Sequence, residues 1–140
     1  MLGEGGGREI KLGTIMVMTI GDDHEKVHTG VPGYKIHKHF GVVHNKKYYA
    51  ATLNSYAVKE PWILFHLPSR IGVGRSFKTL KEAKVFGLRI AEIKAVNWSS
   101  AMAGKNMSIE GRDLDKVGNG EMTAEDLDVQ LMTAKIKGEI

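Results

Sequence analysis

The stretch from Trp62 to Val96 constrains the fold more than any other part of the chain. It begins with a nearly unbroken apolar run ended by a proline, Trp62-Ile63-Leu64-Phe65-His66-Leu67-Pro68. Such a run is typical of a buried strand. After the turn at Pro68-Ser69-Arg70, residues 71–77 predict a partner strand. Thr79 and Glu82 then have the spacing of a capping box, which predicts that a helix begins there.

The helix that follows is amphipathic and completes the predicted fold class. Its apolar residues recur at helical spacing on one stripe: Ala83, Phe86, Ile90 and Ile93. Further strands are predicted at residues 10–20, 34–40 and 48–53, and residues 22–33 are predicted to form a loop. These elements predict an α+β fold, an antiparallel sheet of four to five strands with a long helix packed on one face. Because Ile63-Leu64-Phe65 is apolar without alternation, we expect that strand to be covered on both sides.

The C-terminal part predicts a polar loop to Gly120 and then a last helix over residues 124–137, capped by Thr123. This helix has two apolar sides. Leu127, Leu131 and Ala134 form one side, and Val129, Met132 and Ile136 form the other. We therefore predict a homo-oligomer formed through the C-terminal helix. The alternative is a helix buried on both sides within one subunit.

Length and composition bound the class of protein. The 140 residues suffice for a single domain, residues 8–140, preceded by a glycine-rich tail, residues 1–7, that we expect to be disordered. The chain has no cysteine, which excludes disulfides, thiolate metal sites and a cysteine nucleophile. No apolar run approaches the roughly 20 residues that cross a bilayer, and we see no signal peptide. We expect a cytoplasmic protein without a membrane partner.

The positive charge is concentrated in the middle of the chain. Residues 34–96 carry nine lysines and three arginines against three glutamates and no aspartate, a net charge of +9, whereas the whole chain carries +4. The C-terminal helix, in contrast, begins with acidic residues. Segregation of charge of this kind predicts an anionic partner.

Basic and aromatic residues of this middle region could together bind nucleic acid. The lysines and arginines would contact phosphates, and the aromatic rings would stack on bases. The candidate residues are Lys46, Lys47, Tyr48, Tyr49, Trp62, Arg70, Arg75, Lys78 and Arg89. The first hypothesis is therefore a nucleic-acid-binding protein that is not an enzyme and needs no cofactor.

Residues 41–96 also resemble a known kind of DNA-binding domain. Trp62 in a strand, Pro68-Ser69-Arg70 at the turn and Phe77-Lys78-Thr79-Leu80-Lys81-Glu82-Ala83 resemble the ethylene-response-type domain and the arm-binding domains of phage integrases. The resemblance implies three antiparallel strands and one helix, with Trp62, Arg70 and Arg75 as DNA contacts. The small size and the lack of a catalytic set also favour a phage or mobile-element accessory protein.

Two other functions compete with nucleic-acid binding. The same basic surface would suit a phage anti-defence inhibitor that binds a nucleotide-type small molecule or an acidic face of a host protein. A histidine-dependent metal hydrolase comes third, since His37 and His39 alternate on a strand and His44 follows. No carboxylate lies between Glu25 and Glu60, however, so these histidines could equally belong to an exposed basic strand face.

Residues 115–126 resemble the loop of a calcium-binding hand. Asp115, Asn119, Gly120 and Asp126 hold the expected positions. Val117 stands where an oxygen ligand is needed, and the last position is the short Asp126 in place of a glutamate. A glycine turn followed by a capped helix explains the same residues.

Overall fold

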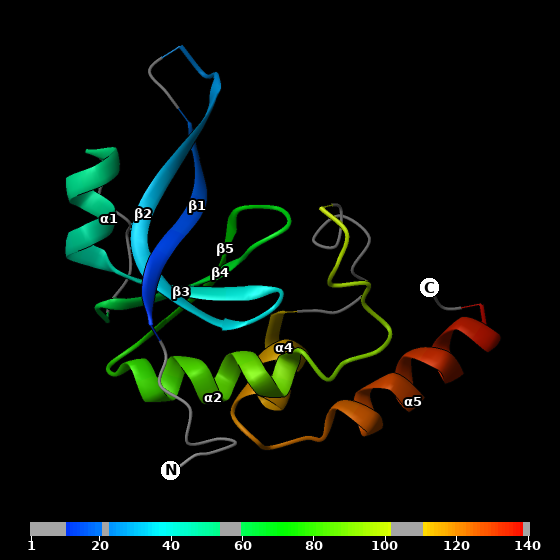
Figure 1. Cartoon of the computed structure of the whole chain (residues 1–140). Helices are drawn as coiled ribbons and strands as arrows, with labels where there is room; N and C mark the ends of the chain where they lie inside the picture. The colour runs from blue at the N-terminus through cyan, green and yellow to red at the C-terminus, as the bar shows by residue number, and fades with distance from the viewer. Residues whose placement is uncertain (1–10, 21–22, 54–59, 102–110, 139–140) are drawn as a thin grey trace.

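The computed structural model describes residues 11–20, 23–53, 60–101 and 111–138 and confirms the α+β fold class (Figure 1). The described strands form one antiparallel sheet in sequence order, β1 (Leu12–Ile20), β2 (Lys26–His37), β3 (Phe40–His44), β4 (Trp62–His66) and β5 (Ile71–Phe77). The helices are α1 (Asn45–Thr52), α2 (Leu80–Ile90), α4 (Gly111–Gly118) and α5 (Ala124–Ile136). No described helix has the length and apolar character of a membrane span. The glycine-rich tail predicted at residues 1–7 lies outside the described residues.

Strand β4 is covered on both faces, as its unbroken apolar run predicts. Leu64 belongs to a core on the face that carries α2, and its neighbours Ile63 and Phe65 belong to a second core under α1. Successive residues of a strand point to opposite faces, so a strand between two cores carries apolar side chains at successive positions, as Ile63, Leu64 and Phe65 do. All three side chains are almost fully buried.

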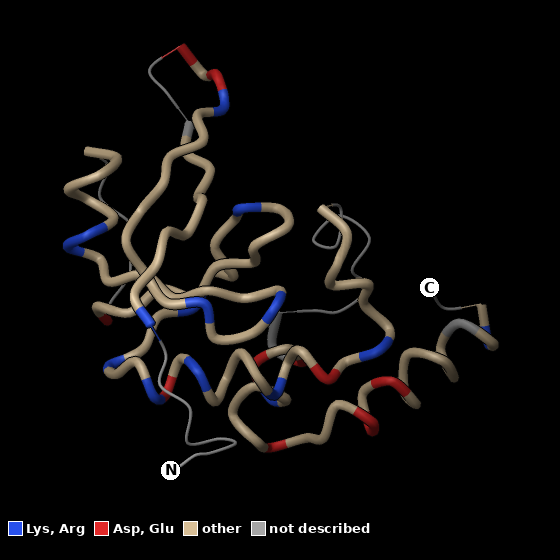
Figure 2. Tube along the Cα trace, viewed as in Figure 1, with Lys and Arg blue, Asp and Glu red and all other residues tan. Residues whose placement is uncertain are grey.

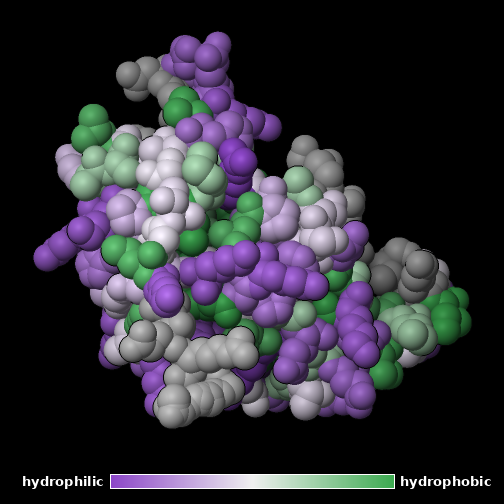
Figure 3. All heavy atoms as spheres, viewed as in Figure 1, coloured by the Kyte–Doolittle hydropathy of each residue, from purple (hydrophilic) through white to green (hydrophobic). Residues whose placement is uncertain are grey.

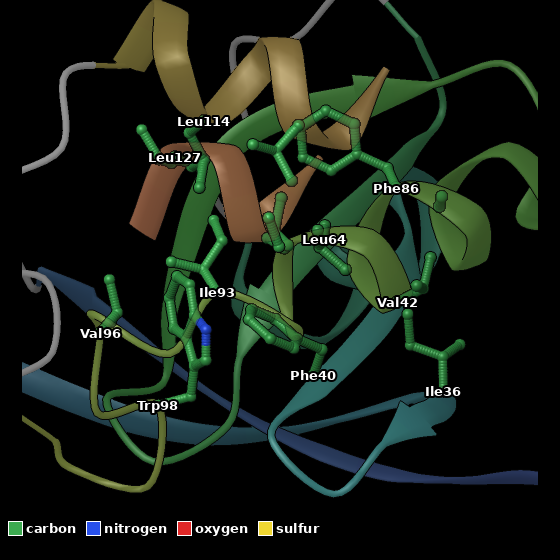
Figure 4. Close-up of a cluster of buried hydrophobic side chains, with 14 residues drawn as sticks. Ile36, Phe40, Val42, Leu64, Phe86, Ile93, Val96, Trp98, Leu114 and Leu127 are labelled. Atoms are coloured by element: carbon green, nitrogen blue, oxygen red, sulfur yellow. The ribbon is translucent and has the colours of Figure 1, made fainter. Parts of the chain in front are cut away.

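The larger core joins the sheet to α2, α4 and α5. Figure 4 shows Phe86 of α2 beneath α4, with Leu114 of α4 and Leu127 of α5 side by side above Ile93. Trp98 closes this core from the segment after α2, with its ring centroid 5.1 Å from that of Phe40.

Residues 45–52 form helix α1, where the sequence predicts a strand over 48–53. The two tyrosines have strand propensity, but only Tyr48 and Ala51, three residues apart, reach the core. His44 caps the helix by accepting the N–H of Lys46, and Leu53 ends it in the left-handed region at φ 61°. Tertiary packing on the second face of the sheet therefore decides the conformation.

Residues 26–37 form one long strand, β2, where the sequence predicts a loop up to residue 33. Pro32 and the glycines around it are responsible for the wrong prediction. β3 pairs with β2 only from Tyr34 onward, so Pro32 lies where β2 has β1 on one side and no strand on the other. A proline is tolerated at such an edge because it has no N–H to donate. Gly33 is required by close packing, since a Cβ there would lie 2.6 Å from the Val42 carbonyl oxygen.

Two further boundaries differ from the predictions. Residues 111–118 form α4, not a loop, and Leu114 and Val117 bury the inner side of this helix. Helix α2 ends at Ile90, although Ile93 and Val96 remain buried beyond it.

The sheet curls so that its two outer strands approach each other at one end. The N–H of Met18 on β1 donates to the carbonyl of Arg70 in the β4–β5 turn at 2.8 Å. In the strand order β1 is an outer strand with β2 as its one partner strand, and its buried residues are Ile15, Val17 and Thr19.

Candidate functional site

Strand pairing brings the rings of Tyr34, His44 and Trp62 together at one end of the sheet. His44 at the end of β3 lies opposite Trp62 at the start of β4, and Trp62 lies opposite Phe77 at the end of β5. The His44 and Trp62 ring centroids are 4.9 Å apart at an interplanar angle of 85°, and the ring of Tyr34 lies 6.1 Å from Trp62. Tyr34, His44 and Trp62 are all half-buried, so each ring keeps an exposed part.

Lysines surround these rings because two helices begin at the same end of the sheet. Lys46 and Lys47 open α1 directly after His44, and Lys78 and Lys81 lie at the start of α2 directly after Phe77. Figure 2 shows these basic positions at the beginnings of α1 and α2, on the same side of the molecule. We call this surface the Trp62 edge; it consists of Tyr34, His44, Trp62, Lys46, Lys47, Lys78 and Lys81.

Local hydrogen bonds fix the backbone that carries the lysines. The Nδ1 of His44 accepts the N–H of Lys46 at 3.1 Å, and the N–H of Asn45 donates to the carbonyl of Pro61 at 2.7 Å. At the start of α2, Thr79 Oγ1 accepts the N–H of Glu82 at 3.1 Å, and Glu82 accepts the N–H of Lys78 at 3.3 Å. The predicted cap by Thr79 is therefore confirmed, whereas Glu82 reaches back to the N–H of Lys78 and not to that of Thr79 as a capping box requires.

The charge at the Trp62 edge is positive but moderated. Both helix amino termini add partial positive charge. The carboxylate of Glu82 lies at the start of α2, and Glu60 lies two residues before Trp62. Four lysines thus stand against two glutamates, which leaves a surface that attracts anions.

The two tyrosines of α1 have different environments. Tyr48 is 6% exposed and stacks on Phe65 at 6.0 Å, so its ring belongs to the core and is not a surface contact. Burial raises the pKa of the Tyr48 phenol above its ordinary value. Tyr49 is exposed on the same helix.

Each of the three predicted arginines has a position or partner outside the Trp62 edge. Arg70 lies in the turn beyond the opposite end of β4, in the left-handed region at φ 64°. Arg75 forms an ion pair with Asp115 of α4. Arg89 donates to the carbonyl oxygen of Gly118 at 3.2 Å. The structure thus brings Lys46, Lys47, Trp62 and Lys78 together. It places Arg70 beyond the opposite end of β4, and Arg75 and Arg89 each have a partner on α4.

The predicted histidine site does not assemble. The rings of His37 and His39 are 5.5 Å apart, and His37 Nδ1 accepts the N–H of His39 at 3.1 Å. His44 lies at the other end of β3, about 13 Å away at 3.3 Å per residue. Partial burial, with Lys38 nearby, lowers the pKa of both His37 and His39. Among the described residues, no three His, Asp or Glu side chains are grouped so as to hold a metal ion.

Residues 115–126 form the glycine turn and capped helix and do not form a calcium loop. Asp115 lies within α4 and pairs with Arg75. Gly120 makes the turn at φ 82°, and Thr123 Oγ1 accepts the N–H of Asp126 at 3.0 Å. The carboxylates of Asp115 and Asp126 thus belong to separate helices and separate structural roles.

A shallow open hollow of about 230 Å³ lies between α2 and the end of α4. Its polar lining includes Glu82, Arg89 and Asn119. Pockets that enclose a nucleotide-sized ligand have volumes of roughly 300 to 1,000 Å³. The hollow is therefore too small and too open to enclose a nucleotide.

Sequence reasoning missed the contribution of Tyr34 and His44 to the aromatic group. Tyr34 reads as one residue of an alternating strand, and His44 reads as a metal candidate. Only the register of β3 with β4 shows that His44 faces Trp62. The useful signal is that the strand at residues 40–44 is followed directly by Lys46 and Lys47, while Pro61 directly precedes the strand at residues 62–66.

No protein-family model, no curated protein and no solved structure matches the chain. The resemblance of residues 41–96 to the ethylene-response-type and phage-integrase-arm domains stays a prediction. β3, β4, β5 and α2 provide three antiparallel strands and a helix, but α1 is inserted after β3 and covers the sheet face that carries Ile63 and Phe65.

Proposed function

We propose that this protein binds nucleic acid, through the Trp62 edge, without being an enzyme. The observation that carries the proposal is the pairing of β3, β4 and β5, which places Trp62 and His44 between the lysines that begin α1 and α2. Lysines on either side of partly exposed aromatic rings provide phosphate contacts and a stacking surface.

Single-stranded nucleic acid suits this surface best. The Trp62 ring is only partly exposed, which suits stacking on an unpaired base better than contact with a base pair stacked inside a duplex. Of the described arginines, Arg70 lies in the turn beyond the opposite end of β4, and Arg75 and Arg89 have partners on α4. This supports binding that depends little on sequence, since bidentate arginine is the commonest base-specific contact.

Tryptophan fluorescence tests the proposal directly. The chain has two tryptophans, and Trp98 is 7% exposed in the core, so a surface ligand should quench only Trp62. Titration with single-stranded oligonucleotides of increasing length should quench the wild type, with affinity that rises with length. The Trp62→Phe variant, which keeps Trp98, should show no quenching.

The same titration separates the competing functions. A nucleotide-type small molecule would saturate the protein as a mononucleotide, with no gain in affinity for longer strands. An acidic host-protein face would be imitated by poly-glutamate of equal charge, which should bind far more weakly than the oligonucleotide if stacking contributes. Equal affinity for poly-glutamate would overturn the proposal in favour of an acidic protein partner and so support the anti-defence hypothesis.

A further inference from the structure

The outward face of α5 carries a line of exposed apolar side chains. Val129, Met132 and Ile136 are 57%, 64% and 79% exposed. The opposite face of the same helix packs on the core through the buried Leu127 and the half-buried Leu131. Figure 3 shows hydrophobic atoms gathered over the outer end of α5.

The spacing of these side chains matches a seam between two helices. Val129, Met132 and Ile136 are separated by three and then four residues, which is the alternation of the core positions of a coiled coil. Such a line is narrow and straight, so its natural partner is another helix.

The charges beside the seam define the orientation of that helix. Asp126 and Lys137 lie near opposite ends of α5, and at 100° per residue both lie roughly 90° from the seam on the same side. The N–H of Lys137 still donates to the carbonyl of Thr133, so the helical path extends to it. In a parallel pair, Asp126 of one copy and Lys137 of the other would lie at opposite ends of the two helices and could not pair. An antiparallel second α5 would set Asp126 of each copy beside Lys137 of the other, twice by symmetry.

We propose that α5 pairs with α5 of a second copy of this chain, antiparallel, about a two-fold axis near Met132. Met132 meets Met132 of the second copy, and Val129 meets Ile136 of the second copy. Asp128 holds α5 against its own subunit, because its carboxylate accepts the N–H groups of Lys94 and Ala95 at 3.0 and 2.9 Å. The seam therefore lies on a helix that these hydrogen bonds hold against its own subunit.

The pair is weak because the seam is small. A stable interface buries about 800 Å² on each partner, and three side chains supply well under that area. We expect a dissociation constant on the order of 10⁻⁵ M. Monomer and dimer should therefore both be populated at the protein concentrations used in solution measurements.

Sedimentation equilibrium of the protein alone, over a range of concentrations, measures this pairing. Met132→Glu should weaken association at least tenfold and leave the melting temperature unchanged, since the side chain is exposed. Val27→Glu is the matched control, because Val27 is 43% exposed on β2, away from α5, and should leave association unchanged. A wild type that stays monomeric at every concentration, or equal effects of the two variants, would overturn the proposal.

Charge reversal and cross-linking then test the orientation. Asp126→Lys and Lys137→Asp should each associate more weakly than the wild type, whereas a mixture of the two variants should form a mixed dimer in which every pair is restored. The chain has no cysteine, so Val129→Cys mixed with Ile136→Cys should form a mixed disulfide. Disulfides between two Val129→Cys copies in place of the mixed product would show a parallel pair. None of these measurements contains nucleic acid, so their failure leaves the proposed function of the Trp62 edge unaffected.

Discussion

The imidazole of His66 on β4 donates its Nε2–H to the main-chain carbonyl of Trp98 at 2.6 Å. A carbonyl oxygen only accepts, so Nε2 carries the proton, and Nδ1 accepts from the hydroxyl of Ser69 at 2.7 Å. His66 is 5% exposed, with Phe40 and Trp98 as ring neighbours. This one side chain therefore joins the β4–β5 turn to the segment that follows α2.

The stability of the fold should fall in mild acid because of this buried histidine. Burial lowers the pKa of His66 below its ordinary value of 6.5, and the His39 charge adds to the effect, although the Trp98 carbonyl opposes it. The unfolded chain then binds more protons than the folded chain below pH 6.5. The contribution of neutral His66 to the free energy of unfolding should be complete above pH 6.5. The free energy of unfolding should then decrease as pH falls below 6.5. Urea unfolding at a series of pH values measures this.

His66→Gln identifies the source of that pH dependence. The variant should lose about 1 to 3 kcal/mol at pH 7.5, the cost of disturbing buried hydrogen bonds, and its free energy of unfolding should change less between pH 7.5 and 5. His37 and His39 shift in the same direction, so part of the dependence should remain. His28→Gln, at an exposed position, is the control and should follow the wild type. An undiminished pH dependence in His66→Gln would contradict this account.

Gly118 at the end of α4 should not tolerate a side chain. A Cβ at this position would lie 2.2 Å from the nearest atom of the Phe86 ring, which the core holds in place. Gly118→Ala should therefore destabilise the protein by about 1 to 3 kcal/mol, as other overpacked cores do. Gly13→Ala is the matched control, since nothing lies within 4 Å of a Cβ there, and its melting temperature should be unchanged or slightly higher. Equal melting temperatures for the two variants would show that α4 does not pack on Phe86.

The ion pair between Arg75 and Asp115 should act on stability and not on ligand binding. Both side chains are about a third exposed, so solvent screens the pair, and we expect a coupling energy of about 1 kcal/mol or less. A double-mutant cycle with Arg75→Gln and Asp115→Asn measures it. Arg75→Gln should lower the affinity for single-stranded nucleic acid no more than the loss of one positive charge elsewhere outside the Trp62 edge lowers it. If Arg75→Gln loses as much affinity as Lys78→Gln, Arg75 is part of the binding surface.

The central hairpin and α2 could be predicted from sequence because their signals are local. The proline after Leu67 and the capping box at Thr79 and Glu82 depend only on neighbours in the chain. The unbroken apolar run of β4 also predicted burial on both faces. The structure shows that α1 provides the second cover.

The remaining elements depend on contacts that the sequence does not display. The sequence predicts a strand at Tyr48, because residues 45–52 alone do not show that α1 packs on Val31 and Val43. Pro32 is compatible with β2 only because β3 stops short of it. The concentration of cations in residues 34–96 was correct as a count, but Arg75 turns toward Asp115, which is 40 positions later in the chain. Contacts between distant parts of the chain thus decide which charges lie together on the surface. The strand register decides which rings lie between those charges.

The most direct test of the proposed nucleic-acid interface compares two pairs of lysines with equal change of charge. Lys46→Gln with Lys78→Gln removes two cations from the Trp62 edge, and Lys26→Gln with Lys116→Gln removes two exposed cations from elsewhere. Both double variants lower the formal net charge from +4 to +2. Affinity for a single-stranded oligonucleotide is measured for each over a series of salt concentrations.

The account predicts that the Lys46 and Lys78 variant loses at least tenfold in affinity. Its slope of log affinity against log salt should also decrease by about 1.4, since each phosphate contact on a single strand contributes about 0.7. The Lys26 and Lys116 variant should keep the wild-type slope. Equal losses in the two variants would show that binding follows net charge alone, and would contradict an interface at the Trp62 edge.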